Sequence, residues 1–201
     1  MNKEEVSQRV LQNGEPLPID KFIWDETTNT FSSIEDDLVL DFNEIHHCTF
    51  NTGPYCTFDT GYSCTFKTGP YCTFDTEEDC TFKTGSDCTF DTLSNCTFNT
   101  GSDCTFKTGH YCTFDTRYGC TFDTRADCTF KTEFDCTFNT RSNCTFDTGS
   151  DCVVVRRDVY EVVELKKGEK IKLNGYKVKG YTVIQECEKF PECHQVLKEK
   201  K

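Results

Sequence analysis

The central part of the chain alternates apolar and polar residues over five positions and then breaks the alternation over three. Each unit reads Cys-Thr-Phe-x-Thr followed by a variable triplet, and cysteine returns every eight residues from Cys48 to Cys144. Alternation with a period of two is typical of a β-strand that buries one face. The pattern therefore predicts a short strand over each five-residue segment and a corner over each triplet.

The two faces of the predicted strand differ in what they tolerate. One face carries Cys, Phe and the second Thr, and the other carries the first Thr and a variable position that runs Asn51, Asp59, Lys67, Asp75. A position that accepts Lys and Asp alike faces water, because burying an unpaired charge is costly. We therefore expect Cys, Phe and the second Thr to face inward. The core predicted on this basis includes Cys48, Phe50, Cys96, Phe98, Cys144 and Phe146.

The triplets contain Gly and Pro, which suit tight corners, and Gly can adopt φ > 0 there. Gly-Pro-Tyr recurs 16 residues on, at 53–55 and 69–71, and so does Gly-Ser-Asp, at 85–87 and 101–103. A short fixed period predicts a solenoid, in which each unit buries its apolar face against its neighbours. The 16-residue recurrence favours coils of two octads over coils of three. The expected fold class is all-β, a β-solenoid of 8-residue repeats.

The solenoid is expected over residues 40–155. Upstream of the regular octads, Leu40 and Phe42 are expected to occupy the Cys and Phe positions of a degenerate first octad. A solenoid leaves an open sheet edge at each end, and such edges invite stacking of one molecule on another unless they are covered. Both flanks have the pattern of folded segments, so a monomer is expected, with a dimer as the alternative.

Each flank is predicted to form a cap. The N-terminal cap, residues 1–39, combines a helix over 3–12 with a hairpin in "KFIWDETTNTFSS". The C-terminal cap, residues 156–201, contains a strand in "VYEVVEL" and then a hairpin with Asn174-Gly175 as its two-residue turn. Asn-Gly is the preferred sequence of a tight β-hairpin turn.

This C-terminal hairpin would bring four lysines to one face. With a two-residue turn, Lys172 pairs with Lys177 and Lys170 pairs with Lys179. Directly opposed like charges destabilise a sheet, so the face requires an anion. The four lysines are therefore a candidate site for a partner's acidic patch or a phosphate. The alternative is that acidic groups of the same chain, or water and salt, neutralise them.

Charge is distributed unevenly along the chain. The net charge is -12, and residues 48–151 contribute 15 acidic and 7 basic residues, a net of -8. Residues 1–47 add another -8, and residues 152–201 carry +4. This balance argues against direct binding to nucleic acid or to an anionic membrane. With two octads per coil, the more acidic face is expected to carry one row of Asp59, Asp75, Asp91, Lys107, Asp123 and Asn139.

The sequence contains few candidate catalytic or metal-binding residues. No catalytic constellation can be located, so we expect neither enzyme activity nor a cofactor. Without an apolar leader or membrane-spanning run, the expected compartment is the cytoplasm, where cysteines stay reduced. Buried free thiols are therefore favoured over disulfides and metal ligands. Cys187, Cys193 and His194 form only a weak zinc signal, and His46 and His47, adjacent in a predicted strand, point to opposite faces.

The "CTFxTGxx" octads, over about residues 38–156, resemble the octad-repeat proteins of tailed phages and large DNA viruses. The resemblance implies an accessory protein of a phage or virus, located in the host cytoplasm if it is encoded by a phage. In architecture alone, the chain is also similar to pentapeptide-repeat proteins, some of which mimic DNA.

Three functions compete on these observations. The first is a rigid, non-enzymatic β-solenoid that binds an unidentified host or viral protein. The second is an acidic DNA mimic that inhibits a nucleic-acid-binding protein of the host, supported by the net charge of the repeat. The third is binding to ice or another surface through the outward ranks that begin with Thr49, Thr57 and Thr65.

Overall fold

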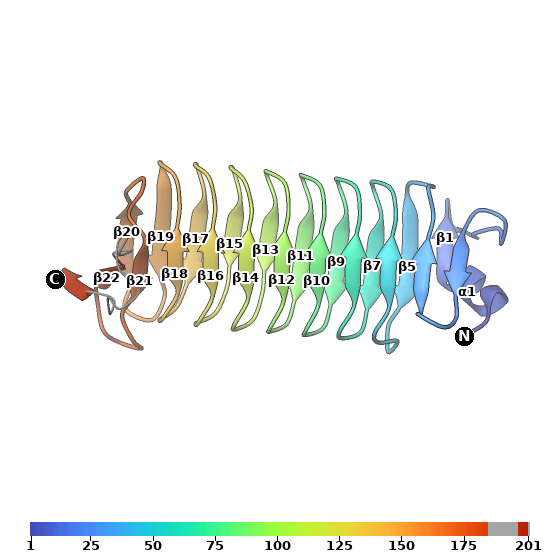
Figure 1. Ribbon diagram of the computed structural model, residues 1–201, viewed down its shortest axis with the longest axis horizontal. Helices are drawn as coiled ribbons and strands as arrows, with labels where there is room; N and C mark the ends of the chain where they lie inside the picture. The colour runs from blue at the N-terminus through green and yellow to red at the C-terminus, as the bar shows by residue number, and fades with distance from the viewer. Residues whose placement is uncertain (185–196, 201) are drawn as a thin grey trace, which may run out of the picture.

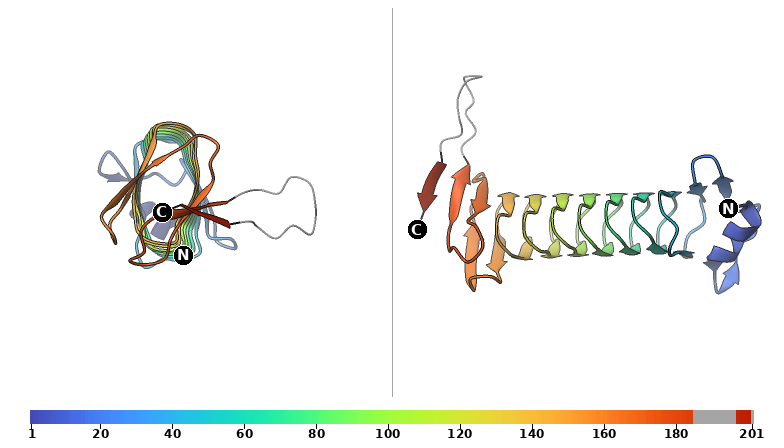
Figure 2. Two further views of the ribbon diagram at one scale, coloured as in Figure 1. Left: turned by 90° about the vertical axis from the view of Figure 1, so that its left-hand side faces the viewer. Right: turned by 90° about the horizontal axis from the view of Figure 1, so that it is seen from below.

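The computed structural model describes residues 1–184 and 197–200, which form a straight, flattened tube (Figure 1). The chain alternates between two facing sheets, and each strand of the regular octads pairs in parallel with the strand 16 residues further on, so that Phe82 lies beside Phe98. Successive coils nearly superimpose when viewed along the axis (Figure 2). The prediction of an all-β solenoid with two octads per coil is confirmed.

From β4 to β19 the strands alternate between the sheets, and sheet A takes the odd-numbered ones. Its parallel part is β5 (Leu38–Phe42), β7 (Thr57–Thr60), β9 (Thr73–Thr76), β11 (Thr89–Thr92), β13 (Thr105–Lys107), β15 (Thr121–Asp123), β17 (Thr137–Thr140) and β19 (Cys152–Arg156). Sheet B contains the others. Its parallel part is β4 (Thr30–Ser32), β6 (Thr49–Asn51), β8 (Thr65–Lys67), β10 (Thr81–Lys83), β12 (Thr97–Asn99), β14 (Thr113–Asp115), β16 (Thr129–Lys131) and β18 (Thr145–Asp147).

Phenylalanine fills the space between the sheets. Within one sheet, Phe82 and Phe98 stack with their ring centroids 4.8 Å apart and their planes 2° from parallel. Across the tube, Phe90 meets Phe98 edge-on at 5.2 Å and 76°. Offset-stacked and edge-to-face pairs are the arrangements that aromatic rings prefer. The core is therefore two stacked columns of rings that interlock with one another.

The cysteines and the inward threonines fill the ends of each flattened coil. The predicted core residues, from Cys48 to Phe146, are all 1% exposed or less. The Cys96 thiol donates to the carbonyl oxygen of Ser94 in the adjoining corner at 3.5 Å. The cysteines at octad positions are free and buried, and Thr60 and Thr140 are buried beside them. These side chains act as small fillers.

The corners use glycine for a reason that the sequence did not reveal. The left-handed residue is the one before each octad cysteine, as in Asp87 with φ of 58°, and Asp and Asn tolerate this conformation best among residues other than glycine. The expectation that the first corner glycine takes φ > 0 is wrong. A Cβ added to Gly85 would lie 2.6 Å from the backbone nitrogen of Pro70 in the preceding coil. Glycine is needed there because the coils approach each other closely.

The first coil is longer than the others, which shifts its register. Leu40 lies beside Phe58 and Phe42 lies beside Thr60, so Leu40 takes the Phe position and Phe42 the second Thr position. This corrects the expected alignment of the degenerate octad. The distance along the chain from Leu40 to Phe58 is 18 residues rather than 16, because the corner at 43–47 is enlarged.

The N-terminal cap covers the end of sheet A with a helix and two short strands. Helix α1 (Lys3–Arg9) starts with a capping box between Asn2 and Glu5. It is shorter than the predicted 3–12, because β1 (Val10–Gln12) leaves the helix and pairs antiparallel with β5. Strand β2 (Glu15–Pro16) pairs with β1 as the outermost strand. A very short edge strand containing Pro offers few groups for further pairing.

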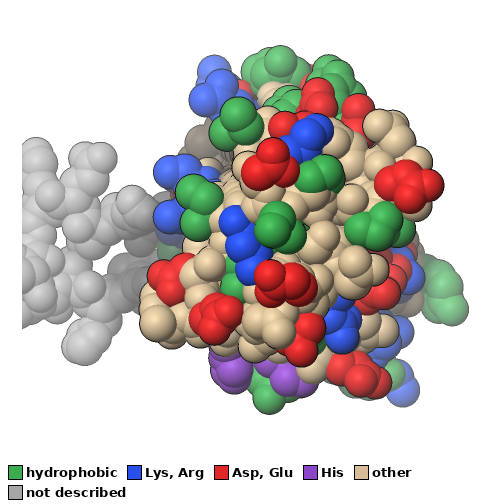
Figure 3. Space-filling model, turned by 90° about the vertical axis from the view of Figure 1, so that its right-hand side faces the viewer, with side chains coloured by type: hydrophobic (Ala, Val, Ile, Leu, Met, Phe, Trp, Pro, Cys, Tyr) green, Lys and Arg blue, Asp and Glu red, His purple; other side chains and the backbone are tan. Residues whose placement is uncertain are grey.

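The predicted N-terminal hairpin is confirmed and lies at the end of sheet B. Strand β3 (Ile23–Asp25) pairs antiparallel with β4. Trp24 is 9% exposed, and its indole N–H donates to the carbonyl oxygen of Met1 at 2.7 Å. Seen from this end, acidic, basic and apolar side chains are interspersed (Figure 3). In the described part of the chain, no helix has the length and apolar character needed to cross a membrane.

At the opposite end, antiparallel strands terminate both sheets. Strand β20 (Glu161–Leu165) folds back on β19 and closes sheet A. On sheet B, β21 (Ile171–Leu173) pairs antiparallel with β18, followed by β22 (Tyr181–Ile184) and β23 (Leu197–Lys200). The switch from parallel to antiparallel pairing stops the solenoid at this point.

A buried arginine organises this C-terminal cap. Arg156 is 0% exposed, and its guanidinium binds the Asp158 carboxylate, with Nη2 2.8 Å from Oδ2. It also donates to the carbonyl oxygens of Val178 at 2.8 Å and Gly180 at 3.3 Å. Arg156 occupies an inward threonine position, beside Thr140. A buried guanidinium is tolerated only when its donors and its charge are satisfied, so the segment from 174 to 180 wraps around it.

Candidate functional site

Four aspartates form a row on the outside of sheet A, which we call the acidic ladder. Asp41, Asp59, Asp75 and Asp91 occupy the variable octad position of β5, β7, β9 and β11 and are direct neighbours in the strand register. Neighbouring strands lie about 4.8 Å apart, so the carboxylates follow one another at that spacing. The row continues with Lys107, as predicted for a coil of two octads.

Cations neutralise only part of this row. Asp91 binds Lys107, with 2.5 Å between Oδ2 and Nζ, and this contact raises the pKa of the Lys107 ammonium. Further along, Asp123 binds Arg157, with 2.7 Å between Oδ1 and Nη2. Asp59 and Asp75 have no ion-pair partner among the described residues. The acidic ladder is therefore strongest towards its N-terminal end.

The carboxylates of the ladder interact with one another. The pKa of Asp59 is raised above its ordinary value of 3.8, first by partial burial and then by the charges of Asp75 and Asp41. A raised pKa means that the ionised form is disfavoured in the folded protein. The ladder is thus a surface where added positive charge is favourable.

We expect the pKa of Asp59 to fall towards 3.8 in the Asp75→Asn variant, because one of the two neighbouring charges is removed. In the wild type, folded Asp59 binds its proton more tightly than unfolded Asp59, so stability decreases as the pH rises through the interval above 3.8. NMR titration of the side-chain carboxyl carbons measures the pKa directly. Asp115→Asn, on sheet B, is the control and leaves the Asp59 titration unchanged. An unaltered Asp59 pKa in Asp75→Asn would show that the carboxylates do not interact.

A pair of exposed tyrosines lies in the corners that lead into two strands of the ladder, β7 and β9. Tyr55 and Tyr71 precede β7 and β9 and stack with ring centroids 4.9 Å apart and planes 4° from parallel. They are 51% and 49% exposed. Both adopt left-handed φ angles of 59° and 61°, which are unfavourable for an aromatic residue. The 16-residue repeat of Gly-Pro-Tyr indicated this pair, but sequence reasoning used the repeat only to count octads.

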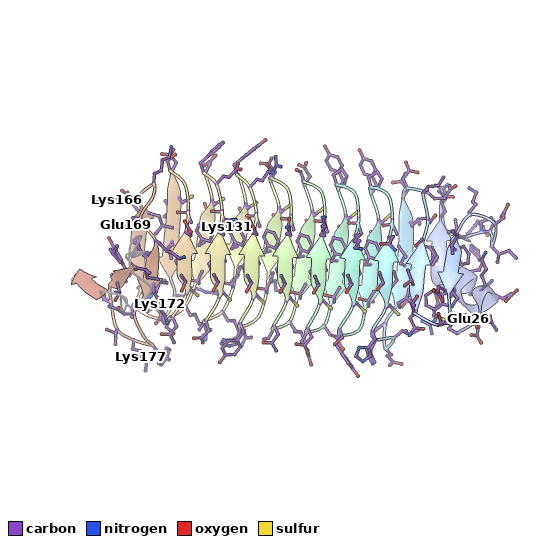
Figure 4. The ribbon with its side chains drawn as sticks, viewed as in Figure 1. Glu26, Lys131, Lys166, Glu169, Lys172 and Lys177 are labelled. Atoms are coloured by element: carbon purple, nitrogen blue, oxygen red, sulfur yellow. The ribbon has the colours of Figure 1, made fainter. Side chains whose placement is uncertain are left out.

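The predicted lysine face does not exist. Lys172 on β21 lies opposite Thr182 on β22, and the hairpin loop spans 174–180 instead of the two-residue Asn174-Gly175 turn. The Lys177 backbone N–H donates to the Asp158 carboxylate at 3.2 Å. Figure 4 shows Lys172 on its strand and Lys177 at the end of the loop. The carbonyl groups of this loop turn towards Arg156, which explains why the chain does not form the tight turn.

The other two lysines, Lys170 and Lys179, are not opposite each other either. Lys170 precedes β21, and Lys179 lies in the loop, with its carbonyl oxygen accepting from the Asn174 side chain at 2.8 Å. The predicted pairs Lys172–Lys177 and Lys170–Lys179 are therefore wrong. The four lysines do not form a single binding surface.

The two adjacent histidines lie in the enlarged first corner, not in a strand. Instead of pointing to opposite faces, both contact Tyr62: His46 stacks on it at 3.9 Å between ring centroids, and His47 meets it edge-on at 5.3 Å. In the described residues, no group of three or more His, Cys, Asp or Glu side chains could hold a metal ion. Cys187, Cys193 and His194 lie outside the described residues.

The outward threonines form straight ranks on both sheets. Thr57, Thr73 and Thr89 are neighbours on sheet A, and Thr65 and Thr81 are neighbours on sheet B. On sheet A the rank lies beside the acidic ladder, and on sheet B it lies beside a row that includes Lys67 and Lys83. Each threonine rank is therefore bordered by charge rather than by a second threonine rank.

The chain was compared with protein-family models, with curated proteins and with solved structures. No match was found. The acidic ladder and the tyrosine pair therefore have to be interpreted from their own geometry.

Proposed function

We propose that this protein is a rigid, capped β-solenoid that binds a basic segment of a partner protein. The binding surface is the N-terminal half of sheet A, where the acidic ladder runs along the strands and the tyrosine pair lies in the corners that precede β7 and β9. The observation that carries the proposal is the uninterrupted register of Asp41, Asp59 and Asp75, which have no ion-pair partner among the described residues. No catalytic role is proposed for any residue.

The shape of the molecule supports binding through its side. At one end the helix and β2 cover sheet A, and at the other β20 folds back on β19. The sheets between them are held in register by continuous backbone pairing and by the stacked phenylalanines. A surface that is already ordered loses little conformational entropy on binding.

The chemistry of the surface indicates the kind of partner. Carboxylates spaced about 4.8 Å apart can accept hydrogen bonds from successive Arg or Lys side chains of an extended segment. Exposed tyrosines such as Tyr55 and Tyr71 offer ring faces to the same cations. Tyrosine is enriched in protein interfaces, where it adds contact area at a small entropic cost.

We also propose an origin for the protein and, as a second candidate, a more specific function. The resemblance of the octads to phage and viral repeats supports an accessory protein that acts in the cytoplasm of its host. DNA mimicry is the second candidate, because a straight row of carboxylates can occupy a groove built for phosphates. The net charge of -12 favours this version.

We expect a double charge reversal, Asp59→Lys with Asp75→Lys, to abolish partner capture without loss of the fold. The tagged protein is used to capture proteins from a bacterial lysate over a series of salt concentrations. The captured protein should be basic and should be released as the salt concentration rises, because exposed charge pairs are screened. A captured nucleic-acid-binding protein would favour DNA mimicry.

The control variant is Asp147→Lys with Asp151→Lys, which changes the net charge equally at the far end of the rod. It should capture the same partner as the wild type. If the Asp59 and Asp75 variant captures that partner equally well, the acidic ladder is not the binding surface. A wild type that captures no protein but shapes growing ice crystals would overturn the proposal in favour of the threonine ranks.

A further inference from the structure

A hollow of about 610 Å³ opens on the side of the rod, on the corners that lead from sheet A to sheet B. Leu93, Gly109 and Arg125 occupy the same corner position in successive coils, as the backbone bonds from Gly109 to Leu93 and from Arg125 to Gly109 show. Gly109 has no side chain, so a gap remains between its two neighbours. The hollow lies about midway along the rod and extends towards the C-terminal cap.

One wall of this hollow is a row of three arginines. Arg125, Arg141 and Arg157 occupy successive coils, at intervals of 16 residues, and all three line the hollow. The chain contains six arginines in total, so half of them are in this row. Seven of the thirteen regular octads have Gly at this corner position. Arg125 and Arg141 therefore depart from the repeat at the place where they face the hollow.

The charges of the hollow are only partly paired. Arg157 binds Asp123 at 2.7 Å, and Lys107 binds Asp91 at 2.5 Å. Arg125 and Arg141 are exposed and have no ion-pair partner among the described residues. Neighbouring coils lie about 4.8 Å apart, so the like charges of this row are close together. A bound anion with several charges would remove their repulsion.

We propose that this hollow binds a linear phosphate chain of two or more phosphate groups. The guanidinium fork binds phosphate oxygens in a bidentate manner, and a row of such groups matches an extended polyanion better than a single ion. His110 adds a further donor to the hollow, and its volume falls in the range of small-ligand sites. The hollow shares Asp91 with the C-terminal end of the acidic ladder, where Lys107 neutralises that carboxylate, and the site does not depend on the function proposed above.

Isothermal titration calorimetry with inorganic tripolyphosphate, with ATP and with orthophosphate tests this site at physiological salt. We expect tripolyphosphate to bind the wild type at least tenfold more tightly than orthophosphate does. Arg125→Gln with Arg141→Gln should weaken tripolyphosphate binding at least tenfold while the melting temperature is kept, because both side chains are exposed. Arg117→Gln, an exposed arginine at the same corner position on the opposite side of the tube, is the matched control and should bind as the wild type does.

The ATP arm identifies the source of the phosphate chain. Equal affinity for ATP and tripolyphosphate supports a site that recognises the chain alone, and tighter ATP binding supports a nucleotide. The proposal is overturned if the wild type does not bind tripolyphosphate, if orthophosphate binds equally well, or if the double variant binds as tightly as the Arg117→Gln control.

Discussion

We expect the Phe98→Ala variant to lose about 3–5 kcal/mol of unfolding free energy, the usual cost of emptying a well-packed aromatic site. Phe98 is 1% exposed and stacks at 4.8 Å on Phe82 and on Phe114. It also meets Phe90 and Phe106 edge-on at 5.2 Å. Removing this ring interrupts its own column in the middle of the rod and takes two edge contacts from the facing column, at a point where no cap can compensate.

Urea denaturation, followed by circular dichroism, measures this loss. The matched control is Thr97→Ala, on the same strand but on the outer face, where we expect a change within about 0.5 kcal/mol. Because a solenoid is stabilised mainly by contacts between neighbouring repeats, the transition of the Phe98→Ala variant should also broaden or split. Equal losses in the two variants would show that the inner and outer faces have been assigned wrongly.

The second large effect is expected at the C-terminal cap. Replacing Arg156 with Met should destabilise the cap by about 3–5 kcal/mol, because the Asp158 carboxylate, 1% exposed, would lose its counter-charge. The carbonyl oxygens of Val178 and Gly180 would lose their donors as well. Arg156→Lys keeps the charge but cannot reach all of these acceptors, so it should recover only part of the stability.

Hydrogen exchange of the amides in β20 and β21 reports this loss, since these strands close the end of the solenoid. The exposed Arg117→Met variant is the control and should exchange as the wild type does. Loss of the cap exposes strand edges, so Arg156→Met should also self-associate in analytical ultracentrifugation. A variant with unchanged exchange in β20 and β21 would show that Arg156 does not hold the cap.

The candidate surfaces could be read from the sequence to different degrees. The row of Asp59, Asp75 and Asp91 follows from the 16-residue coil alone, since equivalent positions of stacked coils must be neighbours. The prediction of the lysine face was wrong because it relied on the local preference of Asn174-Gly175 for a tight turn. That preference is worth less than satisfying a buried guanidinium, whose partners come from a different part of the chain.

The sequence by itself determined the all-β solenoid, the two-octad coil and the inward side of each strand, because these depend on short-range periodicity. Tertiary structure decided what depends on contacts between coils or across the caps. Gly85 is required by the backbone of the preceding coil, Leu40 takes the Phe position because the first corner is longer, and the loop after β21 folds around Arg156. None of these contacts joins residues that are close in sequence, so no local pattern records them.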